Sequence, residues 1–219
     1  MRRANWWMAL AALCLLPWPA EAQPVFRERA RQLPPAILVP VDELAAALER
    51  DGLPSGPLFA KALEGAAKGV PADRLLPALD RYGARLRQAR SLLGGAVEPA
   101  VLMAGVDALT RGVPPATLRG LRQPERRPVT LVVLADLVGS GLPADQALTV
   151  VRDAMARRAA DDALLGIPAL ARRLLRERGS TDAAFQALRQ RIRQGGGRIG
   201  PPAPPGSEPL SRDRLRGGG

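Results

Sequence analysis

Apolar residues recur at the spacing of an α-helix through most of the chain, from position 41 to position 194. Residues 145–155 show this best, because their apolar positions share one face and their polar positions the other. The apolar face consists of Ala147, Leu148, Val151, Ala154 and Met155. No segment alternates convincingly at the period of two that a half-buried strand requires. The pattern therefore predicts an all-α domain over residues 41–194.

A triplet of glycine, a branched apolar residue and proline occurs five times in this region. Glycine can take the left-handed conformation that ends a helix, and the next apolar residue can fold back onto the last turn. Proline suits the first position of the following helix. Each triplet thus predicts a corner between two helices, at Gly52-Leu53-Pro54, Gly69-Val70-Pro71, Gly112-Val113-Pro114, Gly141-Leu142-Pro143 and Gly166-Ile167-Pro168. Because the corners are unevenly spaced, we expect an irregular stack or an orthogonal bundle of helical hairpins rather than a regular solenoid.

The first 22 residues have the pattern of a cleavable export signal. Arg2 and Arg3 precede an apolar run that ends at prolines, and Ala20-Glu21-Ala22 matches a small-x-small cleavage site. A membrane anchor would need about 20 apolar residues, and this run is shorter. We therefore expect a secreted or periplasmic protein with no transmembrane helix after cleavage.

Two further segments differ in composition from the helical domain. Residues 23–40 mix arginines with four prolines, a density that favours an extended leader over a helix. Residues 195–219 are rich in glycine, proline and arginine and have little to bury, which predicts a disordered tail.

The residues missing from the sequence exclude several kinds of chemistry. The chain has no histidine, and its one cysteine, Cys14, lies within the predicted signal. The mature chain would therefore lack a disulfide, a thiol nucleophile, a histidine-based triad and an ordinary zinc site. Two adjacent acidic pairs, Asp42-Glu43 and Asp161-Asp162, stand where helices are expected to begin, and acidic residues there favour the helix dipole. We predict no catalytic residue, no metal site and no cofactor.

The formal net charge of +11 raises the question of an anionic partner. All but two of the 32 basic residues are arginine, a pattern that coding bias also produces. One arginine cluster comprises Arg119, Arg122, Arg126 and Arg127. A second leads from the last helix into the tail and supplies candidate anion contacts at Arg189, Arg191, Arg193, Arg198, Arg212, Arg214 and Arg216.

The only two lysines, Lys61 and Lys68, lie on either side of Glu64 on one predicted helix. Spacings of three and four residues place all three on one face, where Glu64 can pair with both lysines. This group is a candidate interaction surface, and the alternative is an ordinary solvated face.

These observations favour an exported, non-enzymatic interaction or scaffold protein, with an envelope protein as its candidate partner. The alternative is a binder of anionic surfaces, such as membrane headgroups or an acidic polymer, through its arginine clusters and C-terminal arm. An enzyme that uses carboxylates or lysine is the third hypothesis. A helix-glycine-helix corner also occurs in DNA-reading helix-turn-helix motifs, but an exported protein is not expected to meet DNA. The repeated corners resemble those of helical-repeat proteins, which concerns architecture alone.

Overall fold

The computed structural model describes residues 22–94 and 97–194, and this part of the chain is helical with no strand. The all-α prediction is confirmed. The helices are α1 (Ala22–Ala30), α2 (Pro35–Arg50), α3 (Gly56–Ala67), α4 (Ala72–Leu93), α5 (Pro99–Thr110), α6 (Pro115–Arg119), α7 (Pro128–Gly139), α8 (Ala144–Ala156), α9 (Asp161–Arg178) and α10 (Thr181–Gln194). A short 3₁₀ helix, Gln123–Glu125, lies between α6 and α7. The predicted tail, residues 195–219, and all of the predicted signal except Ala22 lie outside the described residues.

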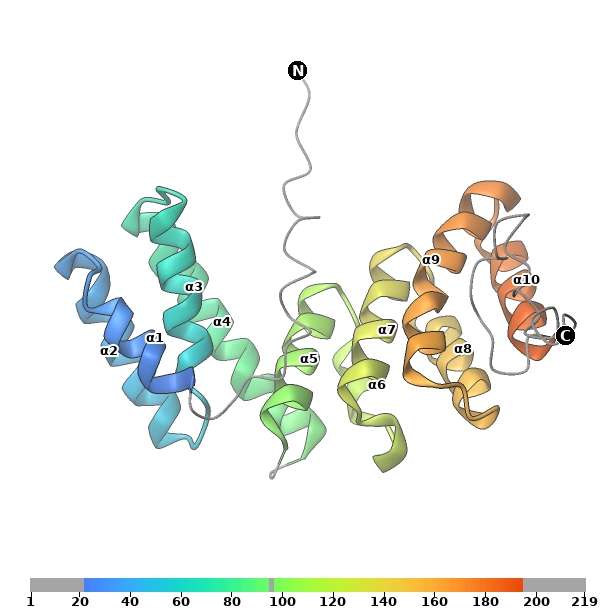
Figure 1. The fold of residues 1–219 in the computed structure, drawn as a ribbon, viewed down its shortest axis with the longest axis horizontal. Helices are drawn as coiled ribbons and strands as arrows, with labels where there is room; N and C mark the ends of the chain where they lie inside the picture. The colour runs from blue at the N-terminus through green and yellow to red at the C-terminus, as the bar shows by residue number, and fades with distance from the viewer. Residues whose placement is uncertain (1–21, 95–96, 195–219) are drawn as a thin grey trace, which may run out of the picture.

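The helices form a stack of hairpins that follow one another along the long axis of the molecule (Figure 1). In one layer α1 packs on α3, α5 on α7 and α7 on α9. In the other layer α2, α4, α6, α8 and α10 contact each other in that order. Helix α4 also packs on α5, which joins the two halves of the row. The predicted stack of helical hairpins is therefore the observed architecture.

The extended leader predicted over residues 23–40 is wrong, because α1 and α2 cover most of this segment. Pro35 occupies the first turn of α2, where proline is tolerated. Pro40 lies inside α2 and removes one backbone hydrogen bond. The helix persists because Ile37, Val41, Ala45 and Leu48 form a buried stripe at helical spacing. The free energy gained by burying that stripe exceeds the cost of the backbone hydrogen bond that proline removes.

Four of the five predicted corners are present. Gly52, Gly69, Gly112 and Gly141 all have positive φ, between 68° and 98°. At the last of them, the Leu142 N–H donates to the Leu137 carbonyl at 3.1 Å and the Gly141 N–H donates to the Val138 carbonyl at 2.9 Å. The other three corners repeat this pair of bonds, which is the Schellman motif that closes a helix at a left-handed residue. The local sequence therefore determines these corners.

The prolines of these corners do not occupy the first helical position as predicted. Pro71, Pro114 and Pro143 are each the N-cap residue, with an extended ψ near 140–150°. Pro54 lies two residues before the start of α3. Proline suits this position because a residue with its φ and an extended ψ turns the chain into the next helix without needing an N–H group.

The fifth predicted corner, Gly166-Ile167-Pro168, is wrong, because these residues lie inside α9. Ile167 and Pro168 are buried there and continue the apolar stripe of the helix. The corner before α9 is made instead at Arg158, whose φ is 54°. The Arg158 N–H donates to the Met155 carbonyl at 2.9 Å and the Ala159 N–H to the Ala154 carbonyl at 3.2 Å, which is the same motif without glycine.

Replacing Arg158 with glycine should raise the free energy of unfolding by about 0.5–1 kcal/mol, because the left-handed conformation strains a residue with a Cβ. Gly141→Val should lower it by about 1–2 kcal/mol for the same reason. Urea denaturation of both variants measures the two shifts. If neither variant differs from the parent in its free energy of unfolding, the left-handed conformation at these corners does not affect stability.

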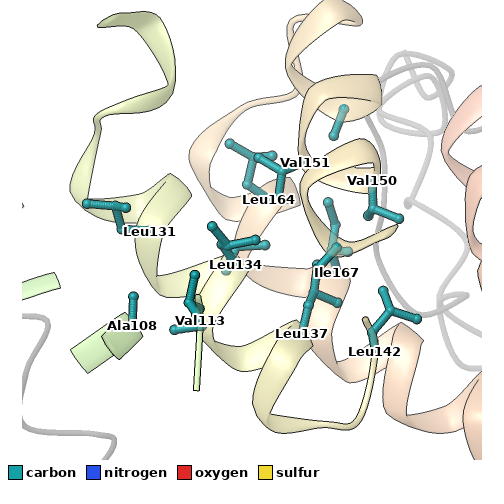
Figure 2. Close-up of a cluster of buried hydrophobic side chains, with 14 of the residues drawn as sticks. Ala108, Val113, Leu131, Leu134, Leu137, Leu142, Val150, Val151, Leu164 and Ile167 are labelled. Atoms are coloured by element: carbon teal, nitrogen blue, oxygen red, sulfur yellow. The ribbon is translucent and has the colours of Figure 1, made fainter. Parts of the chain in front are cut away.

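The buried apolar side chains form two clusters rather than one core. The N-terminal cluster runs from Ala30 to Val106 and the C-terminal cluster from Leu92 to Ile192. Helix α5 serves both, since Leu102 and Val106 face the first cluster whereas Val101 and Ala108 face the second. Figure 2 shows the C-terminal cluster, where side chains of α7, α8 and α9 meet. A helix that is apolar all round, such as α5, is buried on both sides.

Candidate functional site

The only acidic side chain that is buried in the described part of the chain is Glu125, which is 2% exposed. It ends the 3₁₀ helix between α6 and α7. Its carboxylate accepts hydrogen bonds from the Arg122 backbone N–H at 2.9 Å and from Arg122 Nε at 2.7 Å. Arg152 of α8 donates from Nε to Oε1 at 2.8 Å and from Nη2 to Oε2 at 3.0 Å. Two guanidinium groups therefore hold this carboxylate, one of them through a bidentate contact; we call Arg122, Glu125 and Arg152 the clamp.

The clamp is ionised across the ordinary pH range. Burial by itself would raise the pKa of Glu125, but the hydrogen bonds from Arg152 and Arg122 outweigh it and lower this pKa to about 2. The hydrogen bond to Glu125 in turn raises the pKa of Arg152. The clamp therefore carries one negative and two positive charges.

The connection that carries Glu125 is tied to its surroundings by other arginines of the predicted cluster. Arg126 donates to the Leu121 carbonyl at 3.0 Å and to the Leu93 carbonyl at 2.7 Å, which fixes the connection to the end of α4. Arg127 pairs with Asp161 of α9 at 2.5 Å. The cluster at 119–127 thus has a structural role in addition to any contact with a ligand.

A pocket of about 290 Å³ opens beside the clamp. The side chains that line it are Arg122, Pro124, Glu125, Arg152, Met155 and Ala156. Each guanidinium has five N–H donors, and contacts to Glu125 use two on each. The remaining donors and the apolar side chains give the pocket both a positive and an apolar wall.

The predicted lysine surface is only partly as expected. Lys68 pairs with Glu64 on α3. Lys61 does not pair with Glu64, and its Nζ lies 4.9 Å from the ring centroid of Tyr82 on α4. Packing of α3 against α4 supplies this ring, and a cation over an aromatic face is an attractive contact. Lys61 therefore contacts α4, whereas Lys68 and Glu64 pair along one helix, and the three residues do not form a single charged group.

The predicted anion contacts of the arm are distributed over different surroundings. Arg189 pairs with Asp153 of α8 at 2.7 Å and lies over the ring of Phe185. Arg191 and Arg193 are exposed near the end of α10. Arg198, Arg212, Arg214 and Arg216 lie outside the described residues.

The two acidic pairs have different positions. Asp161 and Asp162 occupy the first turn of α9, as predicted. Asp42 and Glu43 lie within α2, because this helix begins at Pro35, so their predicted role at a helix start is wrong. Within residues 22–94 and 97–194, no three His, Cys, Asp or Glu side chains gather in a way that could hold a metal ion. None of the helices in these ranges has both the length and the hydropathy to cross a membrane.

The sequence analysis missed the clamp. Arg152 is one of the polar positions in the helical pattern of residues 145–155, and that pattern gives no role to Glu125. The available signal was a single acidic residue among four arginines between positions 119 and 127, three residues after Arg122. That spacing favours a local contact, but the contact with α8 depends on the tertiary fold. Comparisons with protein-family models, with curated proteins and with solved structures find no match for this chain.

Proposed function

We propose that this chain is an exported, non-enzymatic scaffold that binds another protein through the surface of its helical stack. The observation that carries the proposal is the row of hairpins in Figure 1, in which successive helix pairs lie side by side along the long axis. Such stacks present long continuous surfaces, and helical-repeat proteins use them for binding. The proposal of export rests on the signal-like pattern of residues 1–22.

The distribution of charge within the stack supports a structural role for many ionisable groups. Arg111, which directly follows α5, bridges Asp107 of that helix at 2.8 Å and Asp136 of α7 at 3.0 Å. Arg87 of α4 contacts Asp51, after α2, at 2.6 Å. Such pairs join neighbouring helices, as expected of a rigid body whose function is to hold a surface in place.

Site-specific photo-crosslinking in the native envelope tests the scaffold proposal. The crosslinking residue is placed at exposed positions on different helices, such as Ala84 of α4 and Leu165 of α9. We expect one set of positions to capture a defined protein and the others to capture none. Equal and non-specific capture from every position would contradict a dedicated surface.

Intact mass of the exported protein tests the start of the mature chain, which we expect at Gln23.

The alternative function is binding to anionic surfaces through the C-terminal arm, and the exposure of Arg191 and Arg193 at the end of α10 favours it. Deleting residues 195–219 should leave the melting temperature unchanged and weaken retention on anionic vesicles at low salt, because exposed charge contacts are screened by salt. Elution of the full-length and truncated proteins at the same salt concentration would rule out the arm as a binding element.

A further inference from the structure

We propose that the pocket beside the clamp binds a carboxylate of a partner polypeptide, at a C-terminal residue with an apolar side chain. The inference rests on the proposed scaffold function and deepens it, because it names the chemistry of one contact. Arg122 and Arg152 supply the positive wall, and Pro124, Met155 and Ala156 supply the apolar wall.

The charge of the pocket favours an anion. Glu125 is the one acidic side chain in the lining, and both of its oxygens already accept hydrogen bonds from arginine. Two guanidinium groups against one carboxylate leave one uncompensated positive charge. The planar guanidinium fork matches a carboxylate through two parallel hydrogen bonds, and each fork retains N–H donors after its contacts with Glu125.

The size and the apolar wall of the pocket favour a single residue. A volume of about 290 Å³ is just below the range of roughly 300–1,000 Å³ for small-molecule sites. Met155 is a flexible, polarisable side chain of the kind that adapts to a bound apolar group. Inorganic phosphate would satisfy the guanidinium groups but would leave this wall uncovered, whereas a terminal leucine would cover it and present a carboxylate.

Nuclear magnetic resonance of the full-length protein, labelled with ¹³C at the methionine methyl groups, tests the proposal. The probe is N-acetyl-leucine, which carries one carboxylate and one apolar side chain. We expect a saturable shift of the Met155 methyl signal. Met103 is an internal control, because it packs on the N-terminal cluster, with its sulfur 3.5 Å from the Tyr82 hydroxyl. Its signal should not move.

Two further probes identify the chemistry that is recognised. N-acetyl-leucinamide has the same shape without the charge and should bind at least about tenfold more weakly, since it cannot form the charge-assisted hydrogen bonds of a carboxylate. Phosphate should produce a smaller shift than N-acetyl-leucine at equal concentration. Equal binding of the amide, a shift with phosphate alone, or no Met155 shift with any probe would each overturn the proposal.

Variants at the rim of the pocket separate binding from folding. Ala156 is exposed at the end of α8 and lines the pocket beside the clamp. Ala156→Glu should weaken binding of N-acetyl-leucine more than the neutral Ala156→Gln does, because only the glutamate repels the carboxylate. Arg122→Gln should weaken binding at least about tenfold. Arg31→Gln, at a 72% exposed position on the other end of the stack, is the matched control and should bind normally.

The two proposals fail in different ways. If the Met155 signal does not respond but photo-crosslinking still captures a defined protein, the pocket is not the contact and the scaffold function stands. If N-acetyl-leucine binds but no protein is captured from any surface position, the pocket recognises a small carboxylate and the scaffold function is wrong.

Discussion

Replacement of Arg152 by methionine should lower the free energy of unfolding by about 3 kcal/mol at neutral pH. Methionine removes both hydrogen bonds that Arg152 donates to Glu125 and leaves a buried carboxylate held by Arg122 alone. Removing one partner of a buried ion pair typically costs about 3–5 kcal/mol, because the other charge stays buried without compensation. Arg152 is itself partly exposed, which places the expected value at the lower end of this range. Chemical denaturation at pH 7 measures the difference.

The loss of stability in Arg152→Met should depend on pH, because it depends on the ionisation of Glu125. Its pKa is lowered from 4.5 to about 2 in the folded state, so the folded protein binds the proton less readily than the unfolded chain. The stability contributed by this group is therefore fully present above pH 4.5 and is lost as the pH falls toward 2. The difference between the parent protein and Arg152→Met should shrink over the same interval.

Arg31→Met is the matched control for the clamp. Arg31 pairs with Glu28 at 3.1 Å, but both side chains are largely exposed. Exposed pairs contribute about 0–1 kcal/mol, so this variant should remain close to the parent. The double variant Glu125→Leu/Arg152→Met should recover part of the stability that Arg152→Met loses, because no buried charge is left unpaired. A loss in Arg152→Met no larger than in Arg31→Met would show that the clamp is not a stabilising contact.

Leu134→Ala should lower the free energy of unfolding by about 3 kcal/mol. Leu134 of α7 is fully buried in the C-terminal cluster, where Figure 2 shows it between Leu131 and the side chains of the neighbouring helices. Substitutions of buried leucine by alanine cost about 2–5 kcal/mol, because they remove apolar contact and leave a cavity. Urea denaturation followed by circular dichroism measures the loss.

The same substitution at an exposed leucine provides the control. Leu165 of α9 is 41% exposed, so Leu165→Ala should change the free energy of unfolding by about 0.5 kcal/mol or less. Equal effects of the two substitutions would indicate that the C-terminal cluster is not packed around α7 as described.

Local patterns in the sequence were sufficient for the helical class and for four of the corners. The helical period of residues 145–155 corresponds to α8, since one face of this segment is buried by its neighbours whatever their exact placement. The corners at Gly52, Gly69, Gly112 and Gly141 depend on a conformation that glycine takes without strain. Both kinds of feature involve residues that are close together in the chain.

The predictions that relied on proline and glycine as helix breakers were wrong where burial of an apolar face kept the segment helical. Pro40 in α2 and Pro168 in α9 each remove a backbone hydrogen bond, yet both helices continue. Their apolar faces pack on neighbouring helices, and that burial exceeds the local cost. Arg158 shows the reverse case, in which a residue without the freedom of glycine is held at positive φ. The two helices that it joins are fixed by their packing in the C-terminal cluster.

The candidate site depended most on the tertiary structure. Local patterns predicted an all-α domain over residues 41–194 with glycine corners, and composition gave the large excess of arginine. Only the fold decided which arginines have structural partners, because Arg152 and Glu125 are 27 residues apart and meet where α8 packs beside the connection from α6 to α7. Contacts between distant residues depend on the placement of whole helices, and the periodicity of a single helix carries no information on that placement.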